Sequence, residues 1–386
     1  MKQQITGKLA AARRINICVD IWTKWGMSAS FFGITAHFFS RSDHKRHRVT
    51  IAVKRMPSPH TADRVSELVK TMLQDWEIPE EKVGSVLTDN GSNMVAAFKQ
   101  QVCSTDEDDM DGRESTAEES NDMYDTEMET GETETRLADE VQKEIDDFDD
   151  KEIEHNVAFC QFSRMSCFAH TLQLVIRRFD GIRCIQHVLG KAHTLVSKVN
   201  KSTKATERLI QLAQKKLVNA CPTRWSSTYL LVDRLLEVRQ HLTTVLEELE
   251  WNNLQNTDWK QLDSIRDILS PFAIYTSLIS GEDFTTVSCV VPILMELKMH
   301  LEEMKKKPGL STAAALLQAE LHNRFNKFIS PDDDEFDPTF IISTLLDPRY
   351  KLVLCEKQIR AAKEALIHHI SKQKNGNGTS SPHESP

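Results

Sequence analysis

The sequence lacks several features that would place a protein directly in a large functional class. It has no apolar stretch after its first Lys and no uninterrupted apolar run of about 20 residues, so we expect neither a signal peptide nor a membrane span. It also contains no Gly-rich phosphate loop, no nucleophile elbow and no dinucleotide-binding fingerprint. The sequence therefore gives no indication of P-loop, serine-hydrolase or dinucleotide chemistry.

Dense cysteine spacing is missing as well. The eight cysteines are scattered along the chain: Cys18, Cys103, Cys160, Cys167, Cys184, Cys221, Cys289 and Cys355. This pattern favours reduced thiols in an intracellular compartment over a disulfide scaffold. Cys167 and His170 have a spacing that zinc ligands use, but a structural zinc site takes four ligands and no second pair lies at finger spacing. We therefore expect no structural zinc.

Charge is distributed unevenly. The net charge is −9, yet residues 104–155 alone contain 23 Asp and Glu against 4 Lys and Arg, a balance of −19 that leaves +10 for the rest of the chain. So acidic a segment buries too little apolar surface to offset its ordering entropy, and we expect disorder. Its simplest role is a solvated linker; mimicry of DNA, or masking of the basic body, is the alternative. A basic body is compatible with nucleic-acid contact.

Hydrophobic periodicity predicts strands followed by helices. Strands are expected at 15–22, 30–40, 46–55, 82–89 (buried on both faces) and 162–167, with a helix capped by Thr61 through residue 76 and another at 92–101. Helical periodicity then dominates, with helices at 169–179, 183–199, 206–218, 226–250, 258–280, 288–306, 311–329 and 356–371.

This element order predicts an α/β fold: a ribonuclease-H-like mixed sheet core interrupted by a large all-helical insertion domain. The expected organisation is an N-terminal lead (1–14), the core (15–103 and 159–225), an acidic disordered insertion (104–158), the helical insertion domain (226–355), a C-terminal helix (356–372) and a disordered tail (373–386).

Two carboxylates stand at the ends of short apolar runs. Asp20 lies in Asn16-Ile-Cys-Val-Asp-Ile-Trp-Thr23 and Asp89 in Val86-Leu-Thr-Asp-Asn90. Strands can deliver acidic oxygens to one edge of a sheet, where Mg²⁺ or Mn²⁺ is held against a phosphodiester. The simpler interpretation of each residue alone is an acidic side chain that caps a turn.

Seven motifs in order resemble those of the hAT superfamily of DNA transposases, and most closely the zinc finger BED domain-containing proteins derived from them. They are Cys18-Val-Asp-Ile-Trp-Thr23, Phe32-Gly-Ile-Thr-Ala-His37, His60-Thr-Ala62, Leu87-Thr-Asp-Asn-Gly-Ser-Asn-Met94, Cys167-Phe-Ala-His-Thr-Leu-Gln-Leu174, Cys221-Pro-Thr-Arg-Trp-Ser-Ser227 and Leu345-Leu-Asp-Pro-Arg-Tyr-Lys351. The resemblance covers roughly residues 15–355, and any one motif alone would be weak.

The resemblance implies roles for particular residues. Asp20 and Asp89 match the first two members of a catalytic Asp-Asp-Glu triad, ancestral and expected to be inactive here, and they would be the metal ligands. The third member is a Glu in a Ser-Glu-Arg-x-Phe-Ser context that this sequence does not contain, and neither Glu356 nor Glu364 matches it. Mg²⁺ or Mn²⁺ binding is therefore expected to be weak. The BED finger that would precede the core, and the C-terminal dimerisation region, are not found either.

Four further residues are implied to lie near nucleic acid. Cys167 and His170 match the family's Cys-x-x-His motif, while Arg224 and Trp225 match its Arg-Trp motif, in which the indole would stack on a flipped base. The alternative for His170 is a core or helix-start residue. The alternative for Trp225 is a hydrophobic anchor of its loop.

Three residues outside these sites carry structural expectations. We expect Trp22, beside Asp20, to lie in the core. Asp347 and Pro348 should end a helix, and Arg349 can pair with a carboxylate.

The functional hypothesis is a transposase-derived nuclear protein, without DNA cleavage, acting in DNA-associated or transcriptional regulation. Its expected partners are DNA, bound weakly and non-specifically, and related BED-finger or hAT proteins; no membrane or small-molecule substrate is expected. One alternative is a divalent-metal nuclease or transposase using Asp20, Asp89 and an unrecognised Glu such as Glu356. Another is a fragment of a longer active transposase. Since the usual dimerisation region is not found, a monomer is expected for this chain alone.

Overall fold

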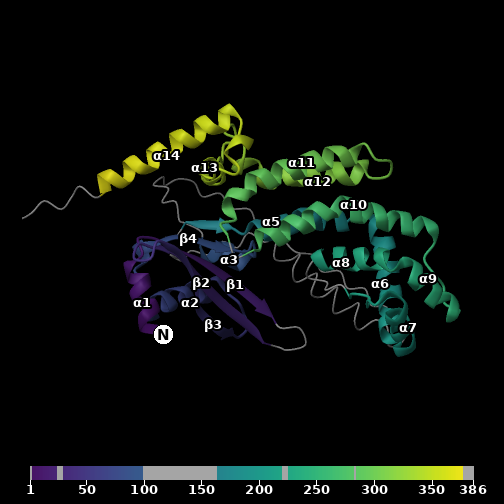
Figure 1. The fold of residues 1–386 in the computed structure, drawn as a ribbon. Helices are drawn as coiled ribbons and strands as arrows, with labels where there is room; N and C mark the ends of the chain where they lie inside the picture. Colours follow the sequence, from purple (N-terminus) through teal and green to yellow (C-terminus); the bar gives the residue numbers. More distant parts are fainter. Residues whose placement is uncertain (1, 24–28, 99–162, 220–224, 282–283, 377–386) are drawn as a thin grey trace, which may run out of the picture. The chain divides into compact units, whose positions relative to one another are not determined.

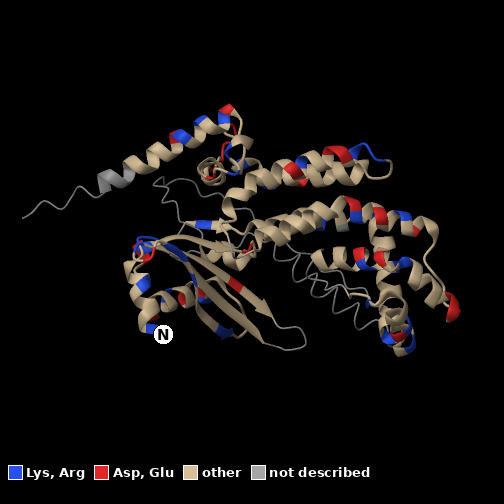
Figure 2. Ribbon diagram, in the orientation of Figure 1, with Lys and Arg blue, Asp and Glu red and all other residues tan. Residues whose placement is uncertain are grey.

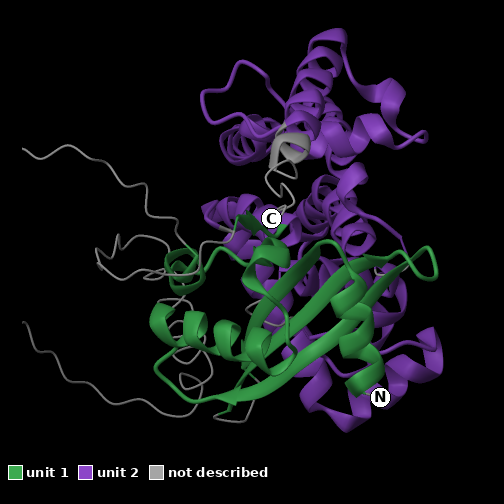
Figure 3. Ribbon diagram, turned by 90° about the vertical axis from the view of Figure 1, so that its left-hand side faces the viewer, with its two compact units in different colours: residues 1–167 green, residues 168–386 purple. Residues whose placement is uncertain are grey.

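The computed structural model describes residues 2–23, 29–98, 163–219, 225–281 and 284–376 (Figure 1). The chain forms two compact units, residues 1–167 and 168–386 (Figure 3). Unit 1 carries a mixed sheet with helices and unit 2 is helical, so the protein is a mixed α/β chain. The predicted acidic segment 104–158 lies outside the described residues.

The sheet of unit 1 has the strand order β3-β2-β1-β4-β5. β1 pairs antiparallel with β2 and parallel with β4, β2 pairs antiparallel with β3, and β4 pairs parallel with β5. The strands are β1 (Ile15–Thr23), β2 (Ser30–Ser40), β3 (Lys45–Met56), β4 (Val83–Thr88) and β5 (Arg164–Ser166). All five strands predicted from the sequence are present, and each observed end lies within two residues of the predicted one.

One face of this sheet is buried under helices. Alternate residues of β2 point into the core, because side chains in a strand alternate between faces: Phe32, Ile34, Ala36 and Phe38 are all buried. They join a cluster that includes Val65, Val69, Met72 and Leu73, at helical spacing on α2 (Ala62–Asp75), and Leu9 of α1 (Lys2–Ala11). The Thr61 side chain caps α2 as predicted, by accepting a hydrogen bond from the Arg64 backbone.

The opposite face of the sheet is more polar and partly exposed. Trp22 lies there with 39% of its surface exposed and stacks on Phe31, their ring centroids 5.9 Å apart, so its predicted core position is wrong. It falls on this face because Ile15, Ile17 and Val19 occupy the buried positions of β1. The predicted burial of the fourth strand on both faces is wrong as well, because Gly84, Ser85 and Leu87 of β4 are only half-buried. Basic residues gather along β3 (Figure 2).

Unit 2 is built from helices around α10, which packs against α5, α6, α8 and α11. Its buried side chains include Leu262, Ile265, Leu269 and Phe272. The helices are α5 (Phe168–Asp180), α6 (Arg183–Lys201), α7 (Thr203–Ala213), α8 (Trp225–Glu237), α9 (Arg239–Glu248), α10 (Asn256–Ile279), α11 (Val290–Lys305), α12 (Ser311–Phe325), α13 (Thr339–Leu346) and α14 (Glu356–Gly376). Among the helices of the described ranges, none has the length and apolar character needed to cross a membrane.

Several helix bounds differ from the sequence-based ones. The predicted helix 226–250 is divided at Val238 into α8 and α9, and α1 and α13 were not predicted. In unit 1, α3 (Ser92–Ala97) ends before residue 101. The last helix continues to Gly376, so the predicted tail begins four residues too early.

Candidate functional site

Of the two predicted acidic residues, Asp20 lies within β1, three residues before its end, and Asp89 directly follows β4. The parallel register of β1 and β4 pairs Ile17 with Val86 and Cys18 with Leu87, and Asp20 and Asp89 each come two residues after that last pair. Continued by two residues, this register would bring the two carboxylates side by side, so it supports their predicted convergence, which stays a prediction. Since side chains alternate along a strand, Asp20 leaves the sheet on the face opposite the buried Val19. Their role as metal ligands stays a prediction.

A tight turn fixes Asp89. Its Oδ1 accepts a hydrogen bond from the Gly91 backbone N–H at 3.1 Å, and the Thr88 hydroxyl donates to its backbone oxygen at 2.8 Å. Gly91 fits here closely, because a Cβ atom on it would lie 3.3 Å from Asp89 Oδ1. One carboxylate oxygen of Asp89 is therefore already engaged by the turn.

Arg164 of β5 braces this turn from the neighbouring strand. Its Nη2 donates to the backbone oxygen of Asp89 at 2.5 Å and to Asn90 Oδ1 at 3.1 Å. Its Nε donates to Thr88 Oγ1 at 2.9 Å, and its Nη1 to Ser166 Oγ at 3.2 Å. Burial lowers the pKa of Arg164, and the nearby Asp89 charge opposes that effect. Sequence reasoning missed this residue, which was predicted only to lie in a strand at 162–167.

The arrangement of Asp20, Asp89 and Arg164 limits what the site could hold. Two carboxylates are a donor set that suits one hard cation, with water completing its coordination. The guanidinium beside Asp89 adds a positive charge next to that position, which disfavours a dication. Among the described residues, no group of three or more His, Cys, Asp and Glu side chains is placed to hold a metal ion. Binding of a single, weakly held Mg²⁺ or Mn²⁺ by Asp20 and Asp89 stays a prediction.

The neighbouring Cys18 and His37 add no charge to this face near neutral pH. Burial raises the pKa of Cys18 to about 11, so the thiol stays protonated. Burial, together with the positive charges of Arg48 and Arg46, lowers the pKa of His37. The His37 ring is also in hydrogen-bond contact with Thr35, at 3.2 Å from Nε2 to Oγ1.

Cys167 and His170 lie on either side of the boundary between the units. The Cys167 backbone N–H donates to the backbone oxygen of Thr88 at 2.8 Å, which places this half-buried residue beside the end of β4. His170 is the third residue of α5 and is exposed. The structure thus brings Cys167 next to the turn that carries Asp89. Whether either residue contacts nucleic acid stays a prediction.

Of the two residues of the Arg-Trp motif, only Trp225 lies within the described part of the chain. Arg224 lies outside the described residues. Trp225 is the first residue of α8 and only 6% of its surface is exposed. So buried an indole presents little ring face to a base, and its position is that of a hydrophobic anchor. Base stacking by Trp225 stays a prediction that would need this residue to move.

The Leu-Asp-Pro-Arg motif has the structural role expected of it. α13 ends at Leu346, directly before Asp347. Asp347 Oδ2 accepts hydrogen bonds from Arg349 Nη2 and Ser288 Oγ, both at 2.7 Å. These partners hold the pKa of Asp347 far below its usual range, with Arg349 the larger cause. Glu356, the alternative third carboxylate, is the first residue of α14.

Comparison with known proteins gives matches over both units. The family model described as ZBED1 RNase-like domain matches residues 18–113, and the one described as ZBED1 RNase-like helical domain matches residues 165–268. The chain is 27% identical to human zinc finger BED domain-containing protein 4 over 220 residues, 54% of this chain and 18% of that protein.

Two further relatives cover most of the chain. It is 21% identical to the zinc finger BED domain-containing protein RICESLEEPER 1 of Oryza sativa over 89% of its own length and 41% of the relative. It is 21% identical to the "Putative transcriptional regulator tpeD" of Talaromyces stipitatus over 91% of its own length and 37% of the relative. The chain thus spans less than half the length of each of these relatives.

Proposed function

Because the chain belongs to the hAT transposase-like family of zinc finger BED domain-containing proteins, we propose that it is a nuclear, DNA-associated regulator derived from a transposase. In this proposal it binds DNA without cutting it. The name of the fungal relative, a transcriptional regulator, supports the regulatory part. The short share of each relative that the chain spans makes the activity of the whole protein part of the proposal.

The proposed fold of unit 1 is a ribonuclease-H-like core. Three consecutive antiparallel strands, followed by two that pair in parallel in the order β3-β2-β1-β4-β5, support it. The match of residues 18–113 to a model described as RNase-like points the same way.

The single observation that carries the proposal is the parallel register of β1 with β4, in which Asp20 and Asp89 each follow the Cys18–Leu87 pair by two residues. A bound Mg²⁺ or Mn²⁺ would supply Lewis-acid activation of a phosphodiester. In this chain the two carboxylates would hold the cation, and the Arg164 guanidinium at the Asp89 backbone oxygen would weaken its binding. Two-metal cleavage needs more ligands than these two side chains provide, so the site is proposed to be a non-cleaving remnant.

DNA association is proposed to be electrostatic. Outside residues 104–155 the chain carries a net charge of +10, and basic residues line β3. Binding that rests on phosphate contacts weakens steeply with salt, because each neutralised phosphate releases condensed counterions.

Fluorescence anisotropy of the chain with labelled duplex DNA, at several salt concentrations, tests DNA association. We expect binding at low salt and a log–log plot of affinity against salt with a slope of several negative units. Two duplexes of unrelated sequence should bind within a few-fold of each other. Failure to bind either duplex at low salt would refute the proposal.

A metal-dependent nuclease is the second candidate, favoured by the same pair of carboxylates. Supercoiled plasmid incubated with the chain and Mn²⁺ distinguishes the two. We expect no nicking above the level of the Asp89→Asn variant. Nicking that this variant abolishes would replace the regulatory proposal with an enzymatic one. If the transcript continues beyond Pro386 into a Ser-Glu-Arg-x-Phe-Ser sequence, the chain is instead a fragment of a longer transposase.

A further inference from the structure

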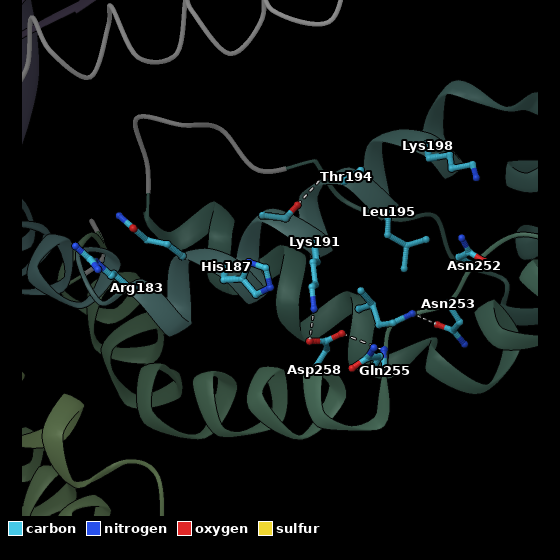
Figure 4. Close-up of a pocket in the computed structure, with 13 residues that line it drawn as sticks. Arg183, His187, Lys191, Thr194, Leu195, Lys198, Asn252, Asn253, Gln255 and Asp258 are labelled. Atoms are coloured by element: carbon cyan, nitrogen blue, oxygen red, sulfur yellow. Dashed lines mark hydrogen bonds and ion pairs between the residues drawn. The ribbon is translucent and has the colours of Figure 1, made fainter.

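Unit 2 contains a cavity of about 960 Å³ between α6 and the turn that leads into α10. Figure 4 shows its lining side chains in a row along α6, facing the polar residues of the turn. The α6 side of the cavity carries Arg183, His187, Lys191 and Lys198, and the turn contributes the amides of Asn252, Asn253 and Gln255. None of these residues belongs to the candidate site described above.

The basic residues of α6 recur at helical spacing. Arg183, Lys191 and Lys198 are eight and seven residues apart, so they lie on one face of the helix, over roughly 22 Å at 1.5 Å per residue. Arg183 and Lys198 are exposed. The Lys198 ammonium lies over the Trp251 ring, 4.2 Å from its centroid.

Among the described residues, Asp258 is the one carboxylate that lines the cavity, and it is already neutralised within the fold. Asp258 accepts a hydrogen bond from Lys191 Nζ at 2.9 Å and another from the Gln255 backbone N–H at 3.0 Å. The Lys191 ammonium holds the pKa of Asp258 below its usual range. Asp258 is buried and caps α10 through a capping box. The remaining charge in the cavity, at Arg183 and Lys198, is positive.

We propose that this α6 groove binds the phosphodiester backbone of DNA, with Arg183 and Lys198 contacting phosphates and the amides of the facing turn donating further hydrogen bonds. Lys and Arg side chains, with Asn and Gln amides, are the groups that position proteins on nucleic-acid backbones without reading sequence. A row of charge about 22 Å long suits a strand of several nucleotides better than a single phosphate. The inference rests on the DNA-binding function proposed above and names the surface that performs it.

Gly190 provides a sharp test of the groove. It lines the cavity on the exposed face of α6, and a Cβ atom placed on it meets nothing within 4 Å. Gly190→Glu would therefore put a carboxylate into the groove without a clash, and Gly190→Gln would put an uncharged side chain of the same shape there. Both residues also favour a helix more than glycine does, so neither variant should unfold.

Anisotropy with labelled duplex DNA on the full chain compares these two variants. We expect Gly190→Glu to bind about tenfold more weakly than Gly190→Gln, with equal thermal midpoints. The double variant Arg183→Gln/Lys198→Gln should lower the magnitude of the salt slope by about 1.8, the value for two phosphate contacts. Lys363→Gln, on α14, removes a charge elsewhere in unit 2 and should change the slope little.

The outcomes separate the groove from the general function. If the unaltered chain binds no DNA, both proposals fail. If it binds DNA and the Glu and Gln variants bind equally, the groove is refuted and the DNA-binding function stands. A polyglutamate competitor that displaces labelled DNA as well as unlabelled DNA does, charge for charge, would overturn the phosphate assignment.

Discussion

Arg164 shows how a single side chain fixes the acidic turn. Its guanidinium donates hydrogen bonds to groups on β4, on the turn and on β5, so one residue links all three. The residue could not be identified from the sequence as a partner of Asp89. More than seventy positions separate the two, and only the register of β4 with β5 brings them together.

Arg164→Gln is expected to destabilise unit 1. The variant loses the planar fork and leaves the Asp89 backbone oxygen and Asn90 without their charged donor, which should lower the free energy of unfolding by roughly 1–3 kcal/mol. Urea unfolding followed by tryptophan fluorescence measures the loss. Arg164→Lys should not restore stability, because an ammonium cannot span the same acceptors. Full rescue by lysine would show that charge alone matters.

Asp347 makes the stability of unit 2 depend on pH, because its contribution is lost when its carboxylate is protonated. Its pKa in the folded chain lies below its unfolded value near 3.9, so its contribution is complete above that pH and is lost as the pH falls toward the folded value. The gap in thermal midpoint between the unaltered chain and Asp347→Asn should therefore be largest near pH 6 and narrow progressively below about pH 4. A gap that stays constant down to pH 2 would contradict this assignment.

At the scale of single elements, hydrophobic periodicity predicted the strands and helices that bury one regular apolar face. β2 was found at its exact bounds and β1 and β3 within one residue, because aromatic and β-branched residues alternate there over a buried face. α1 was missed since it buries only Leu9 and shows no apolar stripe. The break at Val238 was hidden because helical spacing continues through it: Val238 still bonds to Arg234, and Leu242 to Val238.

Met72 of α2 tests the core beneath the sheet. It is 2% exposed and belongs to the same cluster as the buried faces of β1 and β2. Met72→Ala is expected to lower the free energy of unfolding by about 2–5 kcal/mol, the range for large-to-small core substitutions. Its exposed neighbour on the same helix supplies the control, and Thr71→Ala should stay within about 0.5 kcal/mol. Equal effects of the two substitutions in urea unfolding would mean that α2 does not cover the sheet.

At the scale of the whole molecule, the sequence predicted the acidic strand ends but not the α6 groove. Asp20 and Asp89 follow apolar runs, and strands that end at one edge bring such residues together whatever lies between them. The groove instead depends on how α6 packs against the turn before α10, more than fifty residues away in sequence. Periodicity gives the faces of a helix but not the neighbour that each face meets.

The ancestry of unit 1 rests on residues 20 and 89 being side by side, and a cysteine cross-link can test that directly. Neighbouring strands lie about 4.8 Å apart, within the range of Cα separations that a disulfide spans. The experiment uses Asp20→Cys with Asp89→Cys in a Cys18→Ala background, followed by mild oxidation and mass spectrometry of the tryptic peptides. Thr88, which is buried on the other face, supplies the control pair Asp20→Cys with Thr88→Cys.

The structure predicts a disulfide joining peptide 15–24 to peptide 83–99 in the first pair, and none in the control pair. Absence of that link under conditions that oxidise other exposed cysteines of the chain, or an equal yield from both pairs, would contradict the register of β1 and β4. The carboxylate pair would then no longer support descent from a nuclease.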